Sequence, residues 1–233
     1  MKKVAILQSN YIPWKGYFDI INMVDEFILY DDMQYTRRDW RNRNKIMTKN
    51  GLLWLSIPVE VKGKFYQKIN ETKIVDISWV DNHWKSIQYN YAKTKYFSDY
   101  EKHIWEVYEA CRKEEFLSHI NYRFIKKICD ILGIKTKISW SSDYHLVSGK
   151  TERLVGLVKE AGGDYYLSGP AAKDYIVDEL FEQAGIKLEW MDYSGYPEYR
   201  QRGGGNVFEH GVSILDLIFN EGPYAKEYMK SFR

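Results

Sequence analysis

The order of segments at the start of the chain constrains the fold more than any other feature. Within the first 44 residues, an apolar run, a turn, an amphipathic segment and a second apolar run follow one another. Residues 4–7 are aliphatic, which is typical of a strand buried on both faces. Apolar residues recur near helical spacing over 16–24, and residues 27–30 predict a second strand. We therefore expect a parallel βαβ unit.

Polar side chains follow each of the two predicted strands where the strand ends. Gln8 and Asn10 come after the first strand, and Asp31 and Asp32 come after the second. Because parallel strands place their carboxyl ends at one edge of the sheet, where open α/β sheets bind ligands, we expect these side chains to lie together. An arginine-rich loop over residues 37–44 follows closely. The alternative interpretation is that the aspartates cap helices and that the arginines form a solvated surface.

The rest of the chain changes character twice. Residues 52–61 predict a strand that Pro58 makes irregular or peripheral, and residues 62–73 predict an exposed loop. From 79 to 132 the apolar residues recur at helical spacing. Beyond that block the pattern predicts further strands over 136–140, 164–167 and 186–191, and helices over 151–158, 178–184 and 212–220.

These segments predict an α/β fold with a three-layer, Rossmann-like parallel sheet, for which a nucleotidylyltransferase-like sheet is one version. Residues 1–78 and 135–233 would form the two parts of the α/β domain. Residues 79–134 would form a helical insertion or a cap over the sheet edge.

Composition excludes several classes of protein. A net charge of +2 over 233 residues is too balanced to indicate binding to nucleic acid. No segment approaches the ~18 consecutive apolar residues of a membrane span, and no secretory signal is visible, so we expect a cytoplasmic protein. Cys111 and Cys129 lack metal spacing and the five histidines are scattered, so no metal site is predicted. The sequence is compatible with a homo-oligomer and does not predict the oligomeric state.

The aromatic content is unusual. Twenty tyrosines and eight tryptophans supply rigid rings that can stack on sugars or bases and hydrogen-bond at the same time. A compact aromatic core with hydroxyl groups at its rim is the alternative interpretation.

The turn after the first predicted strand resembles a known adenylate site. The Trp14-x-Gly16-Tyr17 turn is similar to the His-x-Gly-His turn of class I nucleotidylyltransferases, in which the glycine lets adenine approach the backbone. Both histidines are absent here, so adenylation is one hypothesis and close packing of the helix on the sheet is the other.

Two other glycine motifs are not nucleotide fingerprints. The Gly149-Lys150-Thr151 tripeptide lacks the earlier glycine of a phosphate loop, since Tyr144 stands at that position. The Gly203-Gly204-Gly205 run is not a dinucleotide fingerprint, because no buried strand leads directly into it. It predicts a flexible loop, which could close over a ligand.

Several short motifs together resemble the WbqC-like family over essentially the whole chain. They are Gln8-Ser-Asn-Tyr11-Ile-Pro-Trp14-Lys-Gly16-Tyr-Phe18, Asp31-Asp32-Met-Gln34-Tyr35, Arg41-Asn-Arg43-Asn44, Ser142, Tyr166-Leu-Ser168-Gly169 with Tyr175, Tyr199-Arg-Gln201 and Ser213-Ile-Leu-Asp216. One departure is Ser9, where the family pattern has proline, and we expect this serine to loosen the turn.

The resemblance implies a sugar-modifying enzyme of bacterial O-antigen or surface-glycan synthesis. The expected reaction is transfer of an acyl or aminoacyl group, such as glycyl, to the amine of a nucleotide-linked amino sugar, with the acyl group activated as an adenylate from ATP or as a thioester. A non-catalytic module that binds nucleotide sugars, and a nucleotidyltransferase-like enzyme, are the alternatives.

We assign expected roles to residues from this reaction. Asp31 or Asp32 would accept the proton of the amine, because adjacent carboxylates resist joint ionisation and the pKa of one is raised. Gln8 would stabilise the oxyanion or, with the other amides, read sugar hydroxyls. The expected substrate-binding residues are Asn10, Tyr11, Trp14, Gly16, Gln34, Arg41, Arg43, Asn44, Ser142, Ser168, Gly169, Tyr175, Tyr199 and Gln201. These roles require the first two loops and the segment 199–201 to share one crevice.

Overall fold

The computed structural model describes residues 1–201 and 208–233, so the predicted glycine loop at 203–205 lies outside the described residues. The strands are β1 (Lys3–Leu7), β2 (Glu26–Leu29), β3 (Arg43–Thr48), β4 (Gly51–Ser56), β5 (Lys137–Trp140), β6 (Tyr165–Ser168) and β7 (Lys187–Trp190). The α-helices are α1 (Lys15–Asn22), α2 (Ser78–Tyr91), α3 (Phe97–Cys111), α4 (Leu117–Leu132), α5 (Thr151–Glu160), α6 (Asp178–Gln183) and α7 (Ile214–Glu221).

Five strands form a parallel sheet in the order β5-β2-β1-β6-β7. The predicted βαβ unit at the start of the chain is confirmed, since β1 pairs in parallel with β2 in the register Val4 to Glu26 through Leu7 to Leu29. The chain moves outward from β1 through β2 to β5, and then returns to β6 on the other side of β1. This order is consistent with a Rossmann-like sheet whose direction reverses between β1 and β6.

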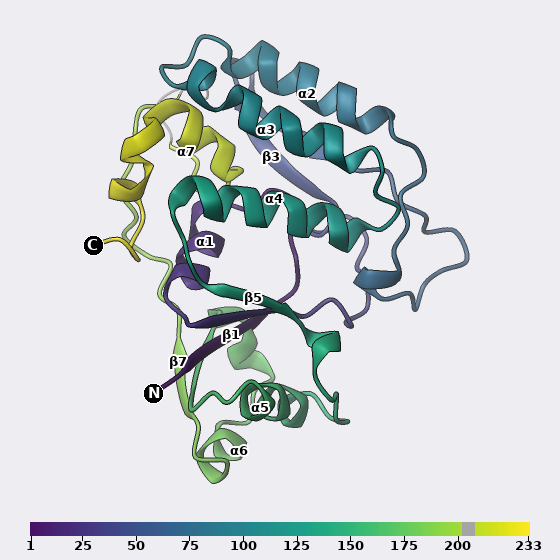
Figure 1. The fold of residues 1–233 in the computed structure, drawn as a ribbon, viewed down its shortest axis with the longest axis vertical. Coiled ribbons are helices and arrows are strands. Elements are labelled where there is room, and N and C mark those ends of the chain that lie inside the picture. Colours follow the sequence, from purple (N-terminus) through teal and green to yellow (C-terminus); the bar gives the residue numbers. More distant parts are fainter. Residues whose placement is uncertain (202–207) are drawn as a thin grey trace.

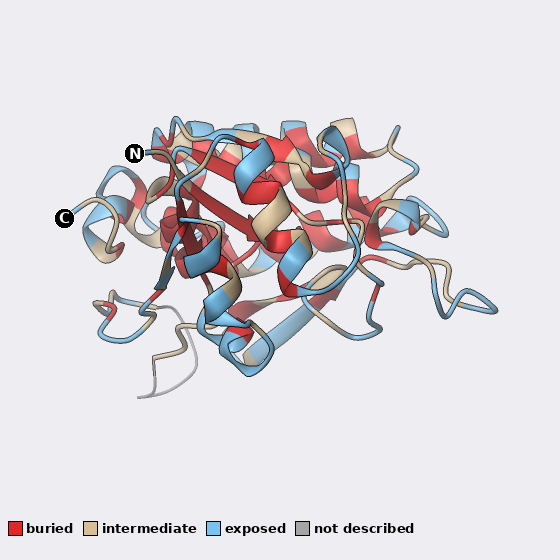
Figure 2. Cartoon of the chain, turned by 90° about the horizontal axis from the view of Figure 1, so that it is seen from below, coloured by how far each residue is buried: buried red, intermediate tan, exposed pale blue. Residues whose placement is uncertain are grey.

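Helices cover both faces of the sheet, and Figure 1 shows the resulting layers. Alternate side chains along β1 point to opposite faces, so that Ala5 packs with α1, α4 and α7, while Val4 and Ile6 pack with α5 and α6. Figure 2 shows the strands as largely buried and the outer sides of the helices as exposed. We call these two layers the α1 face and the α5 face of the sheet.

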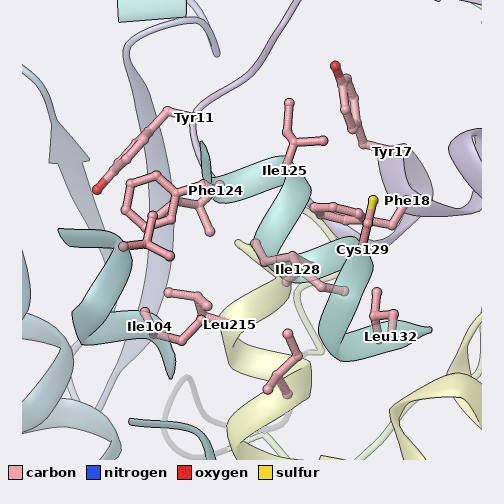
Figure 3. Packing of buried hydrophobic residues seen from close by; sticks show 14 of the residues in the cluster. Tyr11, Tyr17, Phe18, Ile104, Phe124, Ile125, Ile128, Cys129, Leu132 and Leu215 are labelled. Atoms are coloured by element: carbon pink, nitrogen blue, oxygen red, sulfur yellow. The ribbon is translucent and has the colours of Figure 1, made fainter. Parts of the chain in front are cut away.

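The central helical block packs on the α1 face. Phe124, Ile125 and Ile128 lie along one side of α4, where they meet Phe18 of α1 and Leu215 of α7 (Figure 3). Such spacing places residues on one helical face, which explains why this block could be recognised from its periodicity. Its buried residues belong to the same cluster as those of β1 and β2. The division of the chain into three parts therefore stays a prediction.

The region after the arginine-rich loop differs from the sequence prediction. Residues 43–48 form β3, which pairs antiparallel with β4 across the two-residue turn Lys49–Asn50, and Gly51 begins β4 with a positive φ of 101°. The sequence predicts Arg43 and Asn44 in the loop and a strand over 52–61, whereas both residues lie in β3 and β4 ends at Ser56. The polar residues of β3 hid its alternation, although Asn-Gly is a strong hairpin signal.

None of the helices in residues 1–201 and 208–233 combines the length and the apolar character that crossing a membrane requires. Within the same residues, no group of three or more His, Cys, Asp or Glu side chains is placed to hold a metal ion.

Candidate functional site

A cavity of about 990 Å³ lies at the carboxyl ends of β1 and β6. This is the place where the strand order reverses and where open α/β sheets leave a crevice between diverging connections. Its size falls within the range of roughly 300–1,000 Å³ that is usual for small-molecule sites. The lining residues are Ile6, Leu7, Gln8, Asn10, Trp14, Tyr17, Tyr30, Met33, Trp40, Arg41, Gly149, Lys150, Arg153, Leu154, Tyr166, Ser168, Gly169, Pro170, Ala171, Ala172, Tyr175 and Tyr193.

Part of the predicted site comes together in this cavity. The predicted residues that line it are Gln8, Asn10, Trp14, Arg41, Ser168, Gly169 and Tyr175. They follow β1, lie in the arginine-rich loop or follow β6, so the shared sheet edge explains their proximity. Their roles in binding or catalysis stay predictions.

The cavity carries positive charge that no lining carboxylate offsets. Arg41, Lys150 and Arg153 line it, and no Asp, Glu or His is among the described lining residues. Arg41 lies 3.4 Å from Asp39, but neither Lys150 nor Arg153 forms an ion pair with any described carboxylate. Such a concave, cationic surface attracts anions and concentrates them by electrostatic focusing.

Aromatic rings supply most of the remaining wall. Seven tyrosine and tryptophan side chains line the cavity. The Trp14 indole lies edge-on to Tyr193, with their ring centroids 5.2 Å apart. Tyr17 is fixed by a hydrogen bond of 3.0 Å from its hydroxyl to the carbonyl oxygen of Gln8. Rings beside cations suit a ligand that combines phosphate with flat or apolar ring faces.

The Gln8 side chain is a polar group of the cavity that the described residues leave unpartnered. It is partly buried, yet its amide forms no hydrogen bond with another described residue. Asn10 differs, because its Oδ1 accepts a hydrogen bond from Arg41. A free amide at the end of β1 offers both a donor and an acceptor to a ligand.

Asp31 does not face the cavity, contrary to the geometry expected for a base. It is 1% exposed, and it accepts hydrogen bonds from the amide of Ser9 at 2.8 Å and from the Ser9 hydroxyl at 2.6 Å. Burial raises the pKa of Asp31 to about 6, and the charge of neighbouring Asp32 contributes less than burial, the Ser9 hydrogen bonds or Arg41. The raised pKa was expected, but its cause is desolvation rather than repulsion between adjacent carboxylates.

The Asp32 side chain lies outside the cavity lining, on another side of the turn from Asp31. It accepts a hydrogen bond of 2.5 Å from Ser141, lies 3.4 Å from the Asn70 amide and lies 3.8 Å from the Lys68 ammonium group. Successive residues leaving a strand point to opposite sides, which separates this pair. The predicted Ser142 is exposed, and its neighbour Ser141 makes the contact instead.

Ser9 is held firmly, contrary to the expectation that it would loosen the turn. Besides its two bonds to Asp31, its hydroxyl accepts a hydrogen bond of 2.9 Å from Asn121 of α4. The same Asn121 amide donates to the backbone carbonyl of Arg41 at 2.9 Å. This buried network therefore fixes the backbone on both sides of the cavity mouth, next to Gln8 and at Arg41.

The segment 199–201 lies in a second buried network rather than in the cavity. The Tyr199 hydroxyl and the Gln201 amide donate to Asp216 of α7 at 2.6 and 3.0 Å, and Tyr91 of α2 donates at 2.8 Å. The expected common crevice for the first loops and this segment is therefore wrong. Local sequence could not reveal it, because Asp216 satisfies these donors from α7.

Several other predicted residues support the fold around the cavity. Tyr11 is fully buried, and its hydroxyl is 2.9 Å from His83 Nδ1 and 2.7 Å from the Tyr108 hydroxyl. Asn44 donates at 2.7 Å to the carbonyl oxygen of Ile12, which adopts a positive φ of 39°. Both contacts hold the turn that leaves β1.

Gln34 and Arg43, which were also predicted, lie outside the lining. The Gln34 amide donates to the carbonyl oxygen of Phe65 at 2.8 Å. The Arg43 guanidinium stacks 4.2 Å from the ring centroid of Trp54.

The space above Gly16 is already occupied. A Cβ atom built there would lie 2.4 Å from Cζ2 of Trp14, so the indole packs directly on the Gly16 backbone. Glycine at this position therefore allows the Trp14 indole to lie against the backbone, and adenylation and helix-on-sheet packing both stay predictions.

Sequence reasoning missed Tyr30, Trp40, Lys150, Arg153 and Tyr193. Tyr30 directly follows the second strand, so its position was available as a signal. Lys150 and Arg153 flank the start of α5, where the lack of a complete phosphate-loop pattern gives no nucleotide signal. Basic residues at the start of a helix that opens at the carboxyl edge would have been the better signal.

Comparison with known proteins agrees with the motifs. A relative in Mycobacterium tuberculosis (strain ATCC 25618 / H37Rv), the uncharacterized protein Rv1507c, is 49% identical over 233 residues and is covered over its full length, as is this chain. No solved structure matches the chain. The model of the WbqC-like protein family matches residues 8–228. The resemblance found from the motifs is thereby confirmed, and the chain belongs to the WbqC-like protein family.

Proposed function

We propose that this protein binds a nucleotide-linked amino sugar in the cavity at the carboxyl edge of the sheet and transfers an acyl or aminoacyl group to its amine. The observation that carries the proposal is the combination of Arg41, Lys150 and Arg153 with seven aromatic rings and no carboxylate in one cavity. The cations suit a diphosphate and the rings suit a sugar or base. Surface-glycan synthesis would be the setting for such a reaction.

The proposed transfer forms one bond and breaks one bond. The amine nitrogen forms a bond to the acyl carbon, and the bond from that carbon to the sulfur of a thioester or to the phosphate oxygen of an adenylate breaks. The leaving group takes the electron pair, and the proton lost by nitrogen passes to it or to water. Gln8 Nε2 would donate to the carbonyl oxygen as negative charge develops there.

Asp31 has a supporting role in this proposal. It touches Ser9 and not the cavity, so it would position Gln8 through the backbone of the turn rather than accept the proton of the amine.

Mass spectrometry tests the proposal directly. The protein would be incubated with nucleotide-linked amino sugars and either acyl thioesters or glycine plus ATP, and we expect one donor to add the mass of one acyl group. The matching nucleotide sugar with a hydroxyl in place of the amine is the control. Gln8→Leu should lower turnover by ~10²–10³-fold while binding is retained, as for loss of one oxyanion donor.

A non-catalytic binding module is the second candidate. The absence of carboxylate and histidine from the described lining favours it, because most general bases are of these types. Calorimetry separates the two functions. Binding without added mass under any donor supports the module, whereas absence of binding to every nucleotide sugar contradicts both.

A further inference from the structure

The cavity extends over the end of the sheet and has lining residues from both faces. Ile6 and Tyr166 belong to the hydrophobic cluster on the α5 face, whereas Leu7 and Trp14 belong to the cluster on the α1 face. Gln8 directly follows β1, and Ser168 is the last residue of β6. Both lie between the lining residues of the two faces. The cavity is one space whose wall comes from both faces, and we call its two sides the lobe on the α5 face and the lobe on the α1 face.

The lobe on the α5 face has its own cations. Lys150 directly precedes α5 and Arg153 lies in its first turn, and neither forms an ion pair with a described carboxylate. Arg153 donates from Nε to the carbonyl oxygen of Val147 at 2.8 Å, and its guanidinium also interacts with the Tyr30 hydroxyl, which lines the same lobe. Tyr30 and Tyr175 complete this lobe, and Tyr175 is 49% exposed.

The lobe on the α1 face has a separate cation. Arg41 is held by Asn10 and by the network of Asn121, which accounts for its fixed position beside the cavity. Trp14 packs against the cluster on the α1 face and Trp40 directly precedes Arg41 in the chain, so we assign both tryptophans that line the cavity to this lobe.

We infer that the two lobes bind two phosphate-bearing ligands at the same time. The inference rests on the proposed function, in which both substrates carry phosphate: one as a nucleotide sugar, the other as an adenylate or a phosphate-containing thioester. A ligand with one diphosphate has one anionic centre, whereas the cavity offers cationic centres on opposite faces of the sheet. The reacting groups would meet beside Gln8 and Ser168.

Titration with inorganic pyrophosphate tests this inference, because the probe is small enough to enter either lobe. Isothermal calorimetry should give two binding events per chain. Intrinsic tryptophan fluorescence should report only the event on the α1 face, because Trp14 and Trp40 line that lobe. Arg41→Gln should weaken that event about tenfold or more and abolish the fluorescence response, as expected for loss of a charge-assisted contact.

Variants on the other face separate the lobes. Lys150→Gln should weaken the second event about tenfold while the fluorescence response is retained. The variant should fold, because the Lys150 side chain makes no hydrogen bond with the other described residues. Arg38→Gln and Lys159→Gln are matched controls, because both residues are exposed and lie outside the lining, in the same loop and the same helix. Circular dichroism of each variant checks that it is folded.

Two outcomes would overturn the inference, and they differ in what they mean for the proposed function. One binding event that both Arg41→Gln and Lys150→Gln weaken would indicate a single ligand that spans the lobes, and the proposed function would stand. Pyrophosphate binding that neither variant changes, or no binding, would contradict the cationic cavity itself and the proposed function with it.

Discussion

The buried carboxyl group of Asp31 makes a quantitative prediction about stability. Burial raises its pKa from the ordinary value of 3.8 to about 6 in the folded protein. The folded state therefore holds a proton that the unfolded state has already lost between these two pH values. Its contribution to stability is fully present below the unfolded pKa, and it is lost as the pH rises through the folded pKa.

The magnitude follows from the two pKa values. Linkage gives a loss of about 3 kcal/mol between pH values well below 3.8 and well above 6. About 2 kcal/mol of that loss falls between about pH 4.5 and about pH 7.5, which is accessible to experiment. Because Asp31 is 1% exposed, solvent screening does not reduce this figure in the way that it would at the surface.

Urea denaturation of the wild type and of Asp31→Asn, followed by tryptophan fluorescence, measures this quantity. The other titrating groups cancel in the difference between the two proteins, so the wild type should lose about 2 kcal/mol relative to the variant over this pH range. Ser9→Ala is the informative comparison. The Ser9 hydroxyl hydrogen bond lowers the pKa of Asp31, so its loss should raise that pKa further and steepen the dependence.

A difference that stays flat, or that grows in favour of the wild type as the pH rises, would refute this reasoning. It would mean that the Ser9 hydrogen bonds and the charge of Arg41 outweigh desolvation and keep the carboxylate ionised.

Three further substitutions test packing around the site. Gly16→Ala should displace the Trp14 indole and destabilise the protein by about 1–3 kcal/mol, with a shift of tryptophan emission, and an unchanged spectrum would argue against the contact. Tyr91→Phe removes a buried hydroxyl that bonds Asp216, and we expect a loss of about 1–3 kcal/mol in urea denaturation, whereas a neutral result would mean that other donors replace it. Phe124→Ala should cost about 3–5 kcal/mol by calorimetry, because its fully buried ring packs against two tyrosines, and a loss below about 1 kcal/mol would indicate that the core collapses around the cavity.

Local pattern was sufficient for most of the elements. The run at residues 4–7 and the second run at 27–30 became β1 and β2 within one residue at each end, since a strand buried on both faces leaves a continuous apolar signature. The helical block at 79–132 was equally visible, because one apolar side repeats with the helical period. The strand β3 was missed, because its side chains are mostly polar and only its pairing with β4 makes it a strand.

The sequence by itself determined that Gln8, Asn10 and Arg41 lie near one edge of the sheet, since the direction of parallel strands fixes where their loops emerge. Tertiary structure decided which polar groups face that space. Asn121, 112 residues away from Ser9, completes the network that encloses Asp31, and the pairing of β6 with β1 brings α5 with Lys150 to the cavity. Accessibility depends on what packs over a side chain, and those neighbours come from distant parts of the chain that no local pattern specifies.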